Sequence, residues 1–289
     1  MAAEIPVRGD AALVLEGGGM RGQYASGAMD FFLQAGIRFP YVIGVSAGIS
    51  NAASYVSGQF ERNRRIFTTF VGDPGYFSWR NWWTQGNPFG MDFIYRELPD
   101  HIPFDFAAFE ASPTRFRIGA TDCATGQAVF FDKADAPMTE ALLASSSLPM
   151  VGRMARVNGK LYLDGGIADP IPFRQAAADG HPRRVVVLTR NRGFRKPAPG
   201  TAMRAAIRLK YRRFPALAAA VARQAETYNR QLDELEAEAA AGRALVIRPS
   251  RPLAVGRYSQ DRAELERLYR NGWADAEAVL PQLRDFLSP

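Results

Sequence analysis

A serine at the junction of a predicted strand and helix is the first residue that could carry chemistry. The stretch "GVSAG", from Gly44 to Gly48, follows the apolar run 41–43 and precedes a helix rich in small residues. In this G-x-S-x-G pattern a sharp turn presents the serine hydroxyl above the sheet, and the two glycines keep the turn free of side-chain clashes. Ser46 is therefore a candidate nucleophile. The alternative is that it only caps the helix.

A glycine-rich loop near the N-terminus offers backbone N–H groups to a negative charge. The stretch "LEGGGMRG" contains Gly17, Gly18, Gly19 and Gly22 and fits the dinucleotide pattern G-x-G-x-x-G. That pattern expects an acidic residue about 20 positions on, at the end of the second strand, where this chain has its candidate nucleophile. Because free N–H groups at a helix N-terminus favour negative charge, we interpret residues 17–19 as an oxyanion hole. A nucleotide-binding protein is the alternative.

A serine nucleophile needs a base, and the chain has two histidines. His181 lies in a turn before a strand, which puts it at the edge of the sheet opposite to the ligand-binding edge. His101 lies in a loop with prolines. Asp164 ends the strand "KLYLD" and precedes Gly165 and Gly166, which let the backbone turn sharply. The ordinary aspartate pKa, about 3.9, makes a weak base, and burial would raise it. Asp164 could instead cap an Asp-Gly turn.

Strands and helices alternate around these motifs. The runs "ALVLEG" and "YVIGVS" predict buried strands, each followed by a helix, the first ending near Gly36. Short joints between them indicate a parallel sheet with right-handed crossovers. Further strands are predicted in "TRFRIGATD", "GQAVFFD", "GKLYLDGG", "RRVVVLTR" and "ALVIRP", the first two as an adjacent pair. The C-terminal third is predicted to be helical from Thr201 to about Ala241 and from Asp261 to Leu280.

The motifs "EGGGMRG", "GVSAG" and "DGG", in this order and approximate spacing, resemble the patatin-like phospholipase family, as do "ATDCATGQAVFF" and "ASSSLPMVGRMARVNGKLYLDGG". The resemblance runs from about Ala11 to Thr189 and is closest to bacterial stand-alone members. It implies a three-layer α/β/α fold with a mainly parallel sheet. It also implies a serine acyl hydrolase that uses a Ser-Asp dyad without histidine, metal or other cofactor. We expect one domain over residues 1–289, with a core at about 11–190, a cap at about 60–110 and a helical part at about 200–289.

The resemblance assigns a role to each matching residue. It implies that Ser46 is the nucleophile, Asp164 the base and the backbone of 17–19 the oxyanion hole. Arg21 matches the arginine of the family's glycine motif, and we expect it to brace the loop or to contact an anionic head group. Pro170 stands where many members have asparagine, which we interpret as loop variation. The residues expected to support the site are Met20, Arg21, Gly22, Gly44, Gly48, Gly165 and Gly166.

Aromatic residues are concentrated between the nucleophile and the base. The segment from Tyr76 to Phe93 holds three of the four tryptophans within five positions, among Gly, Asn and Pro residues. We expect it to form an apolar lid or an acyl-chain groove over the site. The alternative is that these rings fill the core.

The formal charge of +7 is unevenly placed, since no Asp or Glu lies between His181 and Ala225. No recognised nucleic-acid-binding module is present, so we expect no nucleic acid partner. The basic stretch 183–213 is either a solvated face or a contact with anionic lipid, because "AMRAAIRLKYRRF" interleaves cations with apolar residues. We expect a cytoplasmic protein, peripheral at the inner membrane surface, because no apolar run reaches 18 residues.

Composition also bounds the chemistry. Cys123 is the single cysteine, which excludes an intrachain disulfide and a multi-cysteine metal site. We therefore expect no metal and no cofactor. The predicted function is hydrolysis of ester bonds in phospholipids, lysophospholipids or related lipids. The alternative is a lipid- or membrane-surface-binding protein with weak catalysis.

Overall fold

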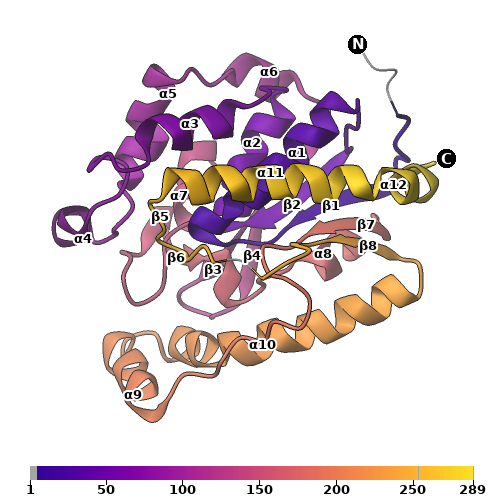
Figure 1. Ribbon diagram of the computed structural model, residues 1–289. Helices are drawn as coiled ribbons and strands as arrows, with labels where there is room; N and C mark the ends of the chain where they lie inside the picture. The colour runs from indigo at the N-terminus through magenta and orange to yellow at the C-terminus, as the bar shows by residue number, and fades with distance from the viewer. Residues whose placement is uncertain (1–4, 253, 289) are drawn as a thin grey trace.

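A central eight-stranded sheet organises the molecule (Figure 1). The computed structural model describes residues 5–252 and 254–288. The strands are β1 (Ala11–Leu15), β2 (Tyr41–Val45), β3 (Arg115–Asp122), β4 (Ala128–Phe131), β5 (Ala155–Val157), β6 (Lys160–Asp164), β7 (Arg183–Val187) and β8 (Ala244–Ile247). Their order is β5-β6-β3-β2-β1-β7-β8, and β4 pairs with β3 off this path. Neighbours from β3 to β8 run parallel, whereas β4, β5 and β6 pair antiparallel.

Helices cover both faces of the sheet (Figure 1). One face carries α1 (Gly22–Gln34), α2 (Ser46–Val56), α3 (Arg62–Phe70), α7 (Met138–Ser145), α11 (Arg262–Ala278) and α12 (Leu280–Leu287). The other face carries α8 (Phe173–Ala178) and α10 (Pro215–Ala240), with α9 (Thr201–Lys210) beside it. Leu13 and Leu15 enter the first core, whereas Ala12 and Val14 enter the second, as alternation along a strand requires. The predicted three-layer α/β/α fold with a mainly parallel sheet is confirmed.

A glycine and a proline mark two of the helix boundaries. α1 ends at Gln34, and Gly36 adopts a left-handed φ of +69°, as the sequence predicted. The helical stretch predicted from Thr201 is divided into α9 and α10. The division falls at Pro215, which has no N–H to continue a helix and is well suited to begin one.

The C-terminal helix α11 packs against α1 with their backbones in contact. A Cβ atom placed on Gly27 would lie 1.9 Å from the carbonyl oxygen of Tyr269, and one placed on Gly272 would lie 1.9 Å from that of Tyr24. A side chain at either position would therefore force the helices apart.

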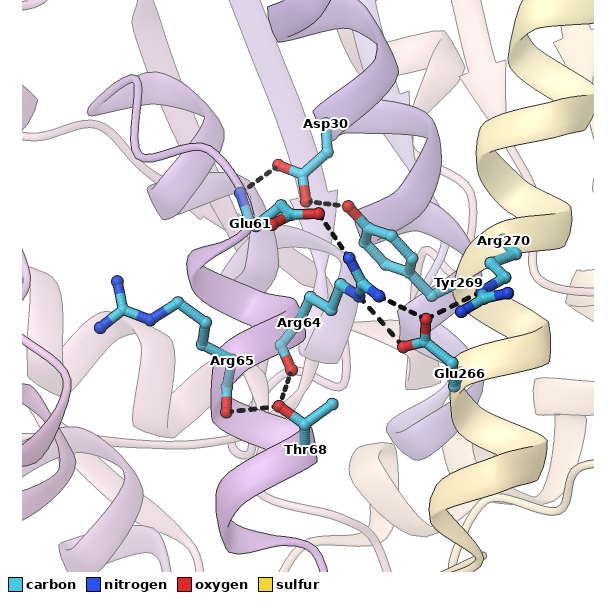
Figure 2. Close-up of polar contacts among 8 residues, drawn as sticks. All are labelled: Asp30, Glu61, Arg64, Arg65, Thr68, Glu266, Tyr269 and Arg270. Atoms are coloured by element: carbon cyan, nitrogen blue, oxygen red, sulfur yellow. Dashed lines mark hydrogen bonds and ion pairs between the residues drawn. The ribbon is translucent and has the colours of Figure 1, made fainter.

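A polar network joins the same helices to α3 (Figure 2). Asp30 accepts hydrogen bonds from the Tyr269 hydroxyl at 2.7 Å and from the Glu61 N–H at 3.2 Å. Arg64 on α3 donates twice to Glu266 on α11, at 2.6 and 3.1 Å. Burial raises the pKa of Asp30 to about 6, although the bond from Tyr269 opposes this rise. The network therefore ties α11 to the N-terminal half of the chain.

The predicted cap segment has a mixed role. It contains α3, α4 (Trp79–Gln85), the π-helical turn η2 (Phe93–Glu97), α5 (Leu98–His101) and α6 (Phe106–Ala111). Phe77 and Phe89 are buried and pack against Tyr258, whereas Trp79 and Trp83 of α4 are 59% and 78% exposed. Some rings therefore fill the core, as the alternative interpretation held, and the rings of α4 face solvent. No helix within the described residues is both long and apolar enough to cross a membrane.

Candidate active site

Ser46 occupies a strained turn between β2 and α2. Its φ of +54° is left-handed, a conformation that costs a non-glycine residue about 1–3 kcal/mol and is common at functional sites. A Cβ atom on Gly44 would lie 2.8 Å from the Leu15 carbonyl oxygen, and one on Gly48 would lie 2.4 Å from that of Glu16. Glycine at both positions therefore lets the turn pass directly beside the end of β1.

Ser145 holds this turn in place. The Ser46 N–H donates to Ser145 Oγ at 2.8 Å, and Ser145 Oγ in turn donates to the Gly119 carbonyl oxygen at 2.6 Å. The sequence offered no signal for this role beyond the serine run of "ASSSLP". The backbone of Ser46 is thereby anchored to β3.

Asp164 is fixed at the end of β6 by several hydrogen bonds. Its Oδ1 accepts from the Gly166 N–H at 2.8 Å, its N–H donates to the Ser147 carbonyl oxygen at 2.8 Å, and its carbonyl oxygen accepts from Thr121 Oγ1 at 2.9 Å. A Cβ atom on Gly165 would lie 2.3 Å from the Gly119 carbonyl oxygen, so this turn also needs glycine. Asp164 is 5% exposed, and its carboxyl group lies beside Ser46.

Burial is the largest influence on the Asp164 carboxyl group, and it raises the pKa, as the sequence predicted. The Ser46 hydroxyl and the charges of Arg257 and Lys196 lower the pKa in part. The Ser46 hydroxyl thus contacts the carboxyl group that would serve as its base. Such contacts are often long in unliganded enzymes and tighten when substrate binds.

The glycine loop follows β1 and lies against Ser46. β1 and β2 are parallel neighbours, and a Cβ atom on Gly17 would lie 2.8 Å from Ser46 Cβ. Gly19 has a φ of +59°, which only glycine adopts without cost. The N–H groups of residues 17–19 have no acceptor within the part of the chain that the structure describes. Thr189, which follows β7, donates from its Oγ1 to the Gly17 carbonyl oxygen at 3.0 Å and so holds the loop in place.

The other predicted support residues lie around this loop. Met20 is buried beside Ser46, and its N–H donates to the Arg257 carbonyl oxygen at 3.1 Å. A Cβ atom on Gly22 would lie 3.0 Å from Ala47 Cβ, so Gly22 lets the starts of α1 and α2 approach. Arg21 is 6% exposed, and burial lowers its pKa to about 10. Thr189 and Arg257 come from distant parts of the chain, and no local signal marked them.

Neither histidine lies near Ser46. The ring of His181 lies 4.2 Å from the ring of Tyr41, the first residue of β2, and is therefore at the opposite edge of the sheet, as predicted. His101 contacts the rings of Phe70 and Phe93. A histidine base for Ser46 is thus not available in this arrangement.

Two cavities meet at Ser46. The larger, about 610 Å³, is lined by Ser46, Asp164 and residues 17–19, together with several cationic side chains. The smaller, about 90 Å³, is mainly apolar and is lined on the cap side by Tyr76, Phe89 and Ile94. The arrangement places a hydroxyl, a buried carboxyl group and free N–H donors around one space.

The family profile described as patatin-like phospholipase matches residues 13–177, more than half of the chain. The chain belongs to the patatin-like phospholipase family. This segment contains the glycine loop, Ser46 and Asp164. A second profile, a domain of unknown function (DUF6363), matches residues 214–288, which include α10, β8, α11 and α12.

The chain is also similar to curated proteins and to a solved structure. The uncharacterized protein YjjU of Escherichia coli is 30% identical over 191 residues, which are 63% of this chain and 52% of that protein. An uncharacterized NTE family protein of Mycobacterium bovis is 37% identical over 70 residues, 24% of this chain and 19% of that protein. The chain thus spans about half the length of the first of these curated relatives and less of the second. Among solved structures, VipD from Legionella pneumophila has a TM-score of 0.48 at 12% identity, with 99% of this chain and 68% of that chain covered.

Proposed function

We propose that this member of the patatin-like phospholipase family is a serine acyl hydrolase that cleaves ester bonds of phospholipids, lysophospholipids or related lipids. The observation that carries the proposal is the meeting of Ser46, the buried Asp164 carboxyl group and the free N–H groups of residues 17–19 in one pocket. In this mechanism Asp164 accepts the proton as Ser46 Oγ attacks the acyl carbonyl carbon.

The glycine loop stabilises the tetrahedral oxyanion that forms next. Each well-placed N–H donor of this kind contributes on the order of 10²–10³ in rate. The α2 N-terminus, which begins at Ser46, adds favourable electrostatic potential for the same charge. Collapse of the intermediate releases the alcohol and leaves an acyl-enzyme, which water hydrolyses with Asp164 again acting as the base. The mechanism uses no cofactor.

The small apolar cavity is suited to the first part of the acyl chain. Its lining includes Ser46 as well as Tyr76, Phe89 and Ile94. The first carbons of an acyl chain attached to the reacting carbonyl would therefore be buried against apolar side chains, which is favourable. The predicted cap would thereby contribute to substrate binding, through the rings that are buried rather than through those of α4.

Contact with an anionic membrane is part of the proposal. Met203 and Leu209 of α9 are exposed beside Arg204 and Arg208, the pattern of an interfacial helix. By contrast, three other cations of the stretch 183–213 are engaged in ion pairs: Arg184 with Glu238, Arg192 with Glu236 and Arg195 with Asp233. The membrane contact is therefore assigned to α9 rather than to the whole basic stretch.

Hydrolysis assays with matched variants test the proposal. Wild-type protein should hydrolyse p-nitrophenyl butyrate and an oleoyl lysophospholipid, and Ser46→Ala and Asp164→Asn should each lose at least about 10³-fold in kcat/KM. His181→Gln, at the opposite edge of the sheet, serves as the control and should retain activity. Binding of lipid vesicles without turnover, by folded wild-type protein, would favour the lipid-binding alternative instead.

A further inference from the structure

The pocket beside Ser46 carries an excess of positive charge. Among its lining residues, two have a carboxyl group, Glu16 and Asp164, and one oxygen of Glu16 already accepts the Thr189 N–H at 2.6 Å. Its cations are Arg21, Arg190, Lys196 and Arg257. None of these four forms an ion pair with a residue that the structure describes.

The four cations act on one another. Burial lowers the pKa of Arg21 to about 10, with a further contribution from Arg190 and Arg257, although Glu16 opposes them. Burial likewise lowers the pKa of Lys196 to about 8, with Arg257 and Arg21 adding to this and Glu16 and Asp164 opposing it. In addition, Arg21 Nε is buried and has no hydrogen-bond partner among the described residues. Like charges held together without partners are stabilised when an anion enters.

Contacts within the protein hold the segments that carry Lys196, Arg190 and Arg257. The Lys196 N–H donates to Asn229 Oδ1 at 2.8 Å, and Asn229 Nδ2 donates to the Lys196 carbonyl oxygen at 3.0 Å, which fixes this loop on α10. The Arg190 guanidinium lies 4.2 Å from the ring of Phe194. The Arg257 carbonyl oxygen accepts from the Met20 N–H at 3.1 Å, which fixes the backbone of Arg257 against the glycine loop.

Three of the four cations come from outside the segment that matches the patatin profile, and only Arg21 lies within it. Arg190 and Lys196 follow β7, and Arg257 precedes α11. The patatin segment thus supplies Ser46, Asp164 and the glycine loop, whereas the remainder of the chain supplies most of the positive charge in the same pocket.

We propose that Arg190, Lys196 and Arg257, together with the buried Arg21, form a subsite for the phosphate group of an acyl ester substrate. The subsite selects esters whose alcohol carries a phosphate of net negative charge over neutral glycerides and over phosphocholine esters. Guanidinium groups bind phosphate oxygens in pairs, and the ammonium group of a choline would be repelled by the same cations. The kinetic consequence of this inference rests on the proposed hydrolase function, but binding at the subsite does not.

Calorimetry on the Ser46→Ala protein tests binding without turnover. The ligands, presented in nonionic detergent, are oleoyl lysophosphatidate, oleoyl lysophosphatidylcholine, monooleoylglycerol and inorganic phosphate. We expect lysophosphatidate to bind at least about tenfold more tightly than the other two lipids, since bonds to charged groups contribute this much or more. Adding Lys196→Met and Arg257→Gln to the same protein should remove most of the preference. Arg192→Gln, on the same loop but exposed and paired with Glu236, is the matched control.

Three outcomes would overturn the subsite: equal binding of the three lipids, a preference that survives the double substitution, or inorganic phosphate binding as tightly as lysophosphatidate, which would indicate a site for free phosphate. In wild-type protein the ratio of kcat/KM for lysophosphatidate to that for monooleoylglycerol should show the same preference. If no ester is hydrolysed while the binding preference holds, the proposed function fails and the subsite stands.

Discussion

The carboxyl group of Asp164 lies under opposing influences. Its burial raises the pKa, and the nearby charges of Arg257 and Lys196 lower it. A base acts in its ionised form, so activity depends on the balance between them. At the scale of single residues, the dependence of activity on pH therefore tests the proposed role of Asp164.

The acid limb of kcat/KM for a neutral ester should report the pKa of Asp164. Because that pKa is raised, we expect the midpoint above the ordinary aspartate pKa, with activity lost as the pH falls through it. Arg257→Gln removes a charge that lowers the pKa and should move the midpoint to higher pH. Arg192→Gln, which carries the same change in charge outside the pocket, should leave it in place. A midpoint that does not respond to Arg257→Gln would separate this limb from Asp164.

The sequence predicted the residues that meet in the pocket better than those that hold them there. Ser46, Asp164 and the glycine loop lie in short motifs, because their chemistry requires particular neighbours. Ser145 and Thr189 act through single hydrogen bonds to backbone atoms far away in sequence, at Ser46 and Gly17. Such pairings depend on the completed fold, so no local sequence pattern predicts them. The catalytic roles themselves stay a prediction.

At the scale of elements, β1, β2, β7 and β8 were predicted because buried parallel strands form apolar runs. The three-residue antiparallel strand β5 was not predicted. The role of α11 could not be predicted, because its contact with α1 depends on two glycines, Gly27 and Gly272, that are far apart in the chain. The patterns of a helix indicate that it is amphipathic but not which helix it packs against.

Gly272→Ala should destabilise the protein by separating α1 from α11. The added Cβ atom would lie 1.9 Å from the Tyr24 carbonyl oxygen, and overpacking of this kind costs about 1–3 kcal/mol or more. Chemical denaturation measures the free energy of unfolding. Gly200→Ala is the control, because no atom lies within 4 Å of the added Cβ. Gly242→Ala would not serve, because Gly242 has a positive φ. Equal stability of the two variants would contradict the close contact.

The network in Figure 2 predicts a dependence of stability on pH. The pKa of Asp30 rises from 3.8 to about 6 on folding, so the folded state binds more protons between these values. The contribution of Asp30 to stability is therefore greatest below about pH 4, is lost as the pH rises to about 6, and amounts to at most about 3 kcal/mol. Asp30→Asn lacks this titration. The free energy of unfolding of the wild type minus that of Asp30→Asn should therefore fall as the pH rises from about 4 to about 6. A difference that stays constant over this range would exclude the titration of Asp30.

At the scale of the whole molecule, two exposed elements contact one loop of the active-site pocket. In the loop 148–154, the Met150 carbonyl oxygen accepts a hydrogen bond from Lys210 Nζ of α9. Arg153 of the same loop donates a hydrogen bond to the Thr84 carbonyl oxygen of α4. Leu148 and Pro149 of this loop line the pocket. The exposed tryptophans of α4 and the exposed cations of α9 therefore flank the same part of the site.

This arrangement predicts which tryptophans enter a membrane surface. Three of the four tryptophans lie on α4, so brominated lipids in anionic vesicles should quench most of the fluorescence of bound protein. Replacing Arg204 and Arg208 with glutamine should weaken vesicle binding, whereas Arg267→Gln, an exposed arginine on α11, should not. Binding without quenching would show that α4 stays in water.

Covalent labelling shows directly whether Ser46 is an activated nucleophile. The protein is treated with a fluorophosphonate and its intact mass is measured, beside Ser46→Ala and Asp164→Asn, with folding checked by circular dichroism. We expect a single adduct on Ser46 in the wild type, none in Ser46→Ala and much slower labelling in Asp164→Asn. Folded wild-type protein that forms no adduct, or an adduct that persists in Ser46→Ala, would contradict the claim that Ser46 is an activated nucleophile.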